Sequence, residues 1–112
     1  MADAPDILTV YRDIAETVGG LALKGKAMRY TAVNGNMFSF LDEGGLCLRL
    51  AAADKTEFGV RYGTGDVLRY GSVMRGYVPV PPELIADAPS LAGWFRRSLD
   101  FAQSLKPRPG KG

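Results

Sequence analysis

The sequence predicts a two-layer α+β domain, in which an antiparallel five-stranded sheet carries helices on one of its faces. Three observations lead to this prediction. A helical apolar stripe lies near each end of the chain, three strand-like runs joined by turn signals follow the first stripe, and a short helix separates them from two further strand-like runs. The strand connections are too short for parallel crossovers, so the pairing is expected to be antiparallel. The predicted element order is α-β(3)-α-β(2)-α.

A first helix is predicted over residues 5–18. Asp3 is a suitable N-cap, and Pro5 suits the first turn, where its missing N–H is not needed. Gly19 and Gly20 then end the helix. The apolar residues that recur at helical spacing, and are expected to face the core, are Ile7, Val10, Tyr11, Ile14 and Val18.

Three strands are predicted next, over residues 27–33, 36–41 and 46–50. The Asn34-Gly35 pair between the first two is the strongest short signal for a hairpin. In the third strand, the side chains alternate: three leucines share one face, and Cys47 and Arg49 share the other.

The second half of the chain is predicted to hold a short helix over residues 51–58 and strands over 67–70 and 73–78. The Gly63-Thr64-Gly65-Asp66 run between them is interpreted as a turn, because a dinucleotide-binding glycine loop follows a strand and opens a helix. Start signals at residues 87–90 precede a last helix. Its apolar stripe consists of Leu91, Trp94, Phe95, Ser98, Leu99, Ala102 and Leu105.

Composition limits the class of protein. A chain of 112 residues accommodates one domain, with residues 1–4 expected as an N-terminal arm and the basic, proline-containing residues 106–112 as a mobile tail. No signal peptide or membrane-spanning run is apparent, and the single cysteine, Cys47, fits a reducing compartment, so a cytoplasmic location is expected. The net charge of +2 is too small to indicate a nucleic-acid partner.

The absence of histidine from the sequence excludes several kinds of site. Ser-His and Cys-His nucleophile pairs cannot form, and one cysteine without histidine cannot build a structural zinc site. The acidic residues are scattered along the chain. We therefore expect no enzyme activity, no cofactor and no metal.

Arginines recur inside the predicted strands and define a candidate interaction face. Since helices are expected on one face of the sheet only, the other face would present arginines mixed with aromatic residues and a thiol. Three interpretations stay open: a solvated face, a dimer or partner surface, where Arg, Tyr, Phe and Met are enriched, and a platform for single-stranded nucleic acid. The candidate residues are Arg29, Cys47, Arg49, Arg69, Arg75 and Tyr77.

Several of these runs resemble the TfoX N-terminal domain family, which is named after a regulator of bacterial competence. The matching pieces, within roughly residues 21–109, are Gly35-Asn36-Met37, Leu46-Cys47-Leu48-Arg49, Val73-Met74-Arg75-Gly76-Tyr77-Val78, the closing helix with Trp94, and Ser104-Leu105-Lys106-Pro107. The first strand departs from the family pattern, because Met28-Arg29-Tyr30-Thr31 stands where the family usually has a Met-Phe-Gly-Gly turn. The resemblance implies a secretion-chaperone-like fold and no enzyme activity.

The preferred interpretation is a small, non-enzymatic interaction domain. The resemblance implies regulation, of transcription or competence, through a protein partner. A homodimer formed by sheet or strand-edge contacts is expected as well. A module that binds nucleic acid or a small ligand on the arginine and aromatic face is the alternative.

Overall fold

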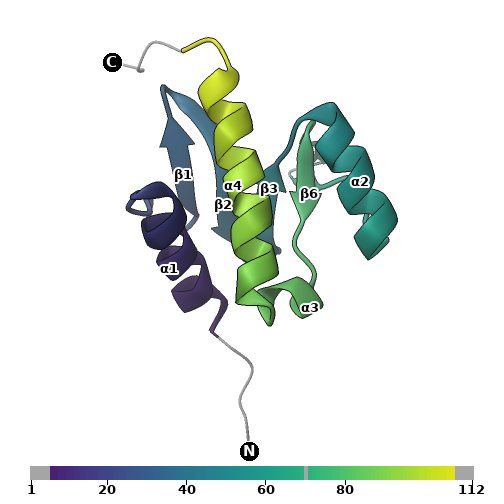
Figure 1. Cartoon of the computed structure of the whole chain (residues 1–112), viewed down its shortest axis with the longest axis horizontal. Coiled ribbons are helices and arrows are strands. Elements are labelled where there is room, and N and C mark those ends of the chain that lie inside the picture. The colour runs from purple at the N-terminus through teal and green to yellow at the C-terminus, as the bar shows by residue number, and fades with distance from the viewer. Residues whose placement is uncertain (1–5, 70, 108–112) are drawn as a thin grey trace, which may run out of the picture.

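The computed structural model describes residues 6–69 and 71–107, and the predicted helices and strands recur there with some changes (Figure 1). The elements in chain order are helix α1 (Ile7–Gly19), strands β1 (Arg29–Val33), β2 (Asn36–Asp42) and β3 (Gly45–Arg49), helix α2 (Ala52–Tyr62), strands β4 (Leu68–Arg69), β5 (Ser72–Val73) and β6 (Tyr77–Pro79), and helices α3 (Pro82–Ile85) and α4 (Ala88–Ser104). The predicted arm, residues 1–4, lies outside the described residues, as does residue 70.

The main sheet has four strands, so the prediction of a five-stranded sheet was wrong. Its strand order is β1-β2-β3-β6 with every neighbouring pair antiparallel, whereas β4 and β5 pair only with each other in a separate hairpin. The predicted strand over residues 73–78 is in fact two strands. Gly76 has a φ of +84° and the Tyr77 N–H bonds the Met74 carbonyl at 3.1 Å, so a turn separates β5 from β6.

The β1–β2 hairpin forms at the predicted Asn34-Gly35 turn, where both residues have positive φ, 53° and 79°. Its register shifts within the strands, because Thr31 pairs with Ser39 but Ala32 pairs with Met37. The bulge gives β2 one extra residue, Phe38, and the usual alternation is interrupted there.

As a result of this bulge, two consecutive side chains of β2 contact helices. The Phe38 ring lies 5.4 Å from that of Phe95 on α4, and the Ser39 hydroxyl lies 2.6 Å from that of Tyr11 on α1. Ser39 also bonds the Thr31 hydroxyl on β1. The buried Ser39 hydroxyl of β2 therefore has partners in both the helix layer and the neighbouring strand.

The helices pack on one face of the sheet. Figure 1 shows α4 running across the sheet with α1 and α2 on either side of it. The large core between the layers draws on all four helices, and among its side chains are Tyr11, Ile14, Phe38, Leu46, Leu48, Phe58, Val78, Leu84, Ile85, Leu91, Trp94, Phe95 and Leu99. The predicted apolar stripes of the first and last helices thus face the core.

Local signals set the helix ends. Asp6 rather than the predicted Asp3 precedes the first turn of α1, and its carboxylate accepts a hydrogen bond from Thr9 at 2.9 Å. Asp3 lies outside the described residues. Gly20, with φ +64°, ends α1 as predicted, and the Asp87 carboxylate accepts the Ser90 N–H at 3.3 Å at the start of α4.

The predicted tail begins close to the sheet. The Asn36 amide of β2 donates to the carbonyl of Lys106 at 3.2 Å, which holds the exit of α4 against the first hairpin. Residues 108–112 of the predicted tail lie outside the described residues. Within the described ranges, no helix combines the length and the apolar character needed to cross a bilayer.

Candidate interaction surface

The second face of the sheet is partly covered by residues at the two ends of the β4–β5 hairpin. Phe40, Cys47 and Tyr77 project from this face and pack with Val67, which immediately precedes β4. The exposed fractions of these four side chains are only 1–6%. The prediction that this face is open was therefore wrong for Cys47 and Tyr77, because Val67 before β4 and Met74 after β5 pack against the cluster that contains them.

Tyr77 is fixed by its own contacts within this second cluster. Its ring lies 5.3 Å from that of Phe40, and its hydroxyl donates to the Met37 carbonyl at 3.0 Å. Burial raises the pKa of Tyr77 to about 12. Tyr77 thus joins β6 to β2 across the sheet and serves the packing of this face.

Arg69 anchors the hairpin to the sheet. Its Nε lies 2.7 Å from Asp42 Oδ2 and its Nη2 lies 3.1 Å from Oδ1, so the guanidinium holds the carboxylate at two points. The side chains of Arg69 and Asp42 are only 19% and 12% exposed. A Cβ at Gly44 would lie 2.6 Å from Arg69 Nη2, so a side chain at this position would displace the end of the Arg69 side chain. Arg69 therefore has a structural role.

The groups around Arg69 have shifted acidities. The hydrogen bonds from Arg69 hold the pKa of Asp42 below its ordinary value of 3.8. Burial raises the pKa of the Cys47 thiol to about 11, although Arg69, whose Nη2 lies 3.6 Å from the sulfur, acts in the opposite direction. Because the thiolate is the reactive form, Cys47 is a poorly reactive thiol at neutral pH.

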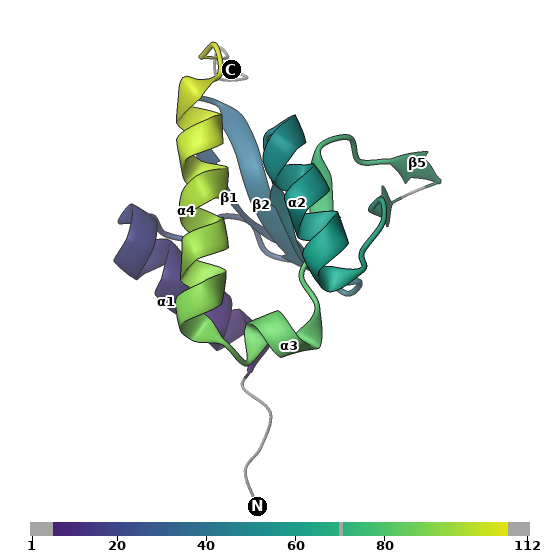
Figure 2. The same cartoon turned by 45° about the vertical axis from the view of Figure 1, so that its right-hand side comes forward.

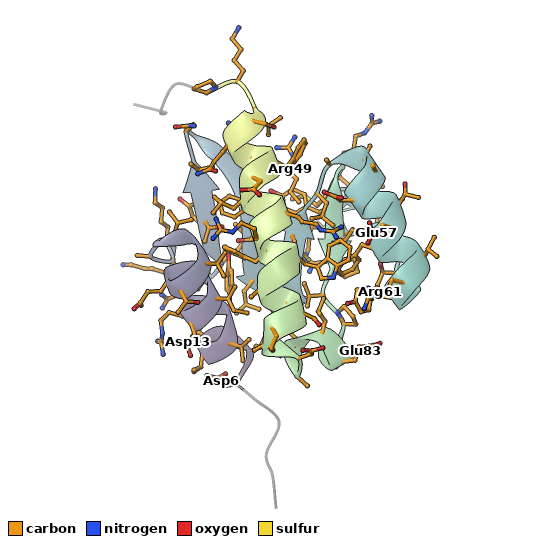
Figure 3. All side chains as sticks on the ribbon, in the orientation of Figure 1. Asp6, Asp13, Arg49, Glu57, Arg61 and Glu83 are labelled. Atoms are coloured by element: carbon orange, nitrogen blue, oxygen red, sulfur yellow. The ribbon has the colours of Figure 1, made fainter. Side chains whose placement is uncertain are left out.

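Two of the predicted arginines, Arg49 and Arg75, meet at one open hollow of about 350 Å³. Arg49 ends β3, and its guanidinium lies 5.7 Å from the centre of the Phe101 ring of α4. Arg75 is exposed in the turn before Gly76. Figure 3 shows Arg49 between α4 and α2, the helix that contributes Lys55 to the same hollow.

Arg29 is not part of this group. It is exposed at the start of β1, opposite Leu41 of β2. In the sheet, β1 forms one edge and β6 the other, so Arg29 and Arg75 belong to opposite edges. The structure therefore does not bring the six predicted residues together. Cys47 and Tyr77 are buried, Arg69 anchors the hairpin, and Arg29 lies apart at the β1 edge. Only Arg49 and Arg75 line the same hollow.

The sequence interpretation missed two exposed apolar residues on the hairpin. Leu68 and Val73 face each other across β4 and β5, with exposed fractions of 61% and 47%. Figure 2 shows β5 projecting from the body on the side of α2. The alternation of side chains along a strand could have indicated the exposure of Leu68. If Val67 is buried, the next side chain points to the opposite side. Lys55 was missed as well, since it belongs to a helix.

The fold is thus a helix layer, a twisted antiparallel sheet and a small anchored hairpin, which is the architecture of a small α+β domain. The family model for the TfoX N-terminal domain matches residues 30–102, well over half of the chain. This chain belongs to the TfoX N-terminal domain family. Among curated proteins and solved structures, no significant match was found.

The extent of the family match agrees with most of the residue runs that indicated the resemblance. The runs from Gly35 to Trp94 lie inside it, whereas the exit at residues 104–107 lies beyond its end. All of α1 and its connection to β1 precede the match. The expected likeness to secretion chaperones stays a prediction.

Proposed function

We propose that this domain is a non-enzymatic protein-interaction module with a regulatory role, and that it forms a homodimer through the β4–β5 hairpin. The observation that carries this proposal is the exposed Leu68–Val73 pair on a projecting hairpin. Apolar side chains that are exposed together are frequent at protein interfaces. The family resemblance supports regulation through a protein partner.

The edges of the main sheet are less suited to association. At the β1 edge, Lys24 pairs with Tyr30 through two backbone hydrogen bonds of 2.9 and 3.0 Å. At the β6 edge, Pro79 has no N–H to offer to an added strand. Proteins commonly protect sheet edges in these ways. The hairpin is the remaining strand pair with exposed apolar residues.

The cross-strand pair is suited to a two-fold dimer. In such a dimer the same patch meets itself, so Leu68 of one copy packs on Val73 of the second copy and the reverse contact also forms. Arg69 supports this arrangement because it ties β4, beside the turn of the hairpin, to Asp42. A projecting element that is held in place by such a contact requires less ordering on association.

Static light scattering over a micromolar concentration series tests the dimer. The wild type is expected to show a dimer mass, and Leu68→Ser combined with Val73→Ser a monomer mass with a nearly unchanged melting temperature. Val60→Ser on α2 is the matched control, because Val60 is 83% exposed and does not belong to the hairpin. A monomeric wild type, or a dimeric double variant, overturns the dimer proposal.

A nucleic-acid module is less well supported than a protein-binding one. A platform for single strands needs exposed aromatic rings on which bases stack, and Phe40 and Tyr77 are 1% and 6% exposed. Retention on a polyanion column that falls steeply with salt is the result that favours this alternative.

A further inference from the structure

We infer that the hollow between β3, α2 and α4 binds an acidic segment of a protein partner, one that carries a carboxylate next to an apolar side chain. This inference rests on the proposed role in protein interaction but uses a different surface from the dimer hairpin. The hollow has a volume of about 350 Å³ and opens to solvent at the surface. That volume accommodates a few side chains of a docked peptide.

The first argument is charge. Arg49, Lys55 and Arg75 come to the hollow from a strand end, a helix and a turn, and none of the described residues that line it is acidic. Neither Arg49 nor Arg75 forms an ion pair with another described residue. Lys55 contributes less, because its Nζ lies 3.0 Å from Asp66. The two arginines therefore present a local positive charge that a carboxylate can neutralise with charge-assisted hydrogen bonds.

The second argument is the apolar part of the lining. Leu50 and Phe101 line the hollow beside the cations. The Arg49 guanidinium lies over the Phe101 ring, 5.7 Å from its centre, so a cation and an aromatic ring are adjacent in the lining. A ligand that carries only negative charge interacts with the cationic side chains and gains nothing from the apolar part of the lining. A carboxylate with a leucine or phenylalanine neighbour also covers the half-buried Phe101 ring, and apolar surface is then buried on both partners.

The third argument is the fixed position of Arg49. Its carbonyl oxygen lies 2.6 Å from the hydroxyl of the buried Ser98 of α4, and it pairs with Tyr77 of β6 in the sheet. The backbone that carries this cation is therefore held by both layers. A cation on a fixed backbone loses less conformational freedom when it binds a ligand.

Nearby acidic residues disfavour a long polyanion. Asp54 and Glu57 of α2 hold Arg97 at 3.3 and 3.1 Å, and the exposed Asp66 holds Lys55. Asp54 and Glu57 lie on α2, which also lines the hollow, and Asp66 is bound to the Lys55 that lines it, so a phosphodiester backbone extending beyond the hollow meets like charge. A short peptide segment stays within the hollow, at the two arginines and Phe101. The charge distribution therefore favours a protein segment over nucleic acid.

A binding assay tests the inference with a short fluorescein-labelled peptide that alternates glutamate with leucine and phenylalanine. We expect saturable binding in fluorescence anisotropy, and amide NMR shifts at residues 49–55, 75–76 and 101. Arg49→Glu with Arg75→Glu should weaken binding by more than about tenfold, since like charges at an interface are strongly unfavourable. Arg12→Glu on α1 makes the same charge change per residue at an exposed site and should leave affinity within about twofold.

Matched peptides and folding controls make the outcome decisive. A peptide with glutamine for glutamate, and one with serine for leucine and phenylalanine, should each bind more weakly. Three results overturn the inference. They are binding of either substituted peptide as tightly as the original peptide, absence of the amide shifts at the hollow, and displacement of the labelled peptide by oligothymidylate as effectively as by the unlabelled peptide. If the double variant melts at a lower temperature than the wild type, the binding assay is repeated with the single variant Arg75→Glu, whose substitution lies in an exposed turn. Binding by the Leu68→Ser, Val73→Ser protein reports the hollow independently of dimer formation, so failure of either proposal can be recognised separately.

Discussion

Asp42 and Arg69 form a two-point ion pair that joins the turn between β2 and β3 to the hairpin β4–β5. The pair lies at the border of the second apolar cluster, and the guanidinium lies 5.5 Å from the centre of the Phe40 ring within that cluster. One contact thus holds the projecting hairpin and helps to cover the second face of the sheet. The stability of this face should depend on the charge of Asp42.

Asp42→Asn should destabilise the protein by about 1–3 kcal/mol at pH 7, the range for a lost hydrogen bond to a charged group. The pKa of Asp42 is lower in the folded protein than its ordinary value of 3.8, so its contribution is complete above that value and is lost as the pH falls through the folded-state pKa. The difference in stability between the wild type and the variant should therefore begin to shrink below about pH 4 and decrease further as the pH falls. Urea unfolding at pH 7 and at pH 3 measures this, and Asp13→Asn on the exposed face of α1 is the control. An unchanged difference at both pH values would contradict the prediction.

Reaction of Cys47 with a thiol reagent should report opening of the hairpin. In the wild type the reaction at pH 8 should be slow, because the thiol is 1% exposed and burial raises its pKa to about 11. Arg69→Met removes the anchor and should speed labelling by at least about tenfold, which corresponds to roughly 1.4 kcal/mol less opening free energy. Arg29→Met, at an exposed position on β1, should leave the rate unchanged. Wild-type labelling at the rate of a free thiol argues against a closed face.

Patterns within about ten residues predicted most of the local structure, whereas long-range pairing escaped prediction. The Asn34-Gly35 hairpin, the glycine end of α1 and the Asp87 start of α4 are local signals, and each is seen in the structure. The division of the last predicted strand at Gly76 depends on a positive φ that the residue type permits but does not require. The return of the hairpin to Asp42 joins residues that are 27 positions apart.

The candidate site was predicted only in part for a related reason. Alternation placed Cys47 and Tyr77 off the helix face, which is confirmed, but alternation alone does not reveal what covers the opposite face. Arg49 and Arg75 were both named, and their meeting depends on the strand register between β3 and β6. Lys55 and Phe101 come from helices whose rotation relative to the sheet is set by packing. The alternation of residues along the strands therefore could not predict that these two helix residues line the hollow.

Trp94→Ala should cost about 3–5 kcal/mol, the range for removal of a large buried aromatic side chain. Trp94 is 6% exposed, lies 4.9 Å from the Phe58 ring in an edge-on arrangement, and donates its indole N–H to the Tyr62 hydroxyl at 3.2 Å. The ring therefore joins α4 to α2. Guanidinium unfolding followed by circular dichroism measures the change. Val60→Ala, on the exposed side of α2, should lie within about 0.5 kcal/mol of the wild type.

The buried hydroxyl of Ser98 connects α4 to two strands at the bulge. Its Oγ lies 3.0 Å from the carbonyl oxygen of Phe38 on β2 and 2.6 Å from that of Arg49 on β3, and the side chain is fully buried. Ser98→Ala removes the hydroxyl donor that these two carbonyl groups share, and the contact with the Phe38 carbonyl is buried, so the unfolding free energy should fall by about 1–3 kcal/mol.

Ser104→Ala is the matched control for this change. Ser104 is exposed, and its hydroxyl bonds the Phe101 carbonyl within the last turn of the same helix, where water can replace it. Its effect should stay within about 0.5 kcal/mol. Urea unfolding of both variants, with amide exchange at residues 38–40 and 49–50, separates a loss at the bulge from a general loss of helix. Equal stability of the two variants would show that the bulge is held by packing of Phe38 rather than by the Ser98 hydroxyl.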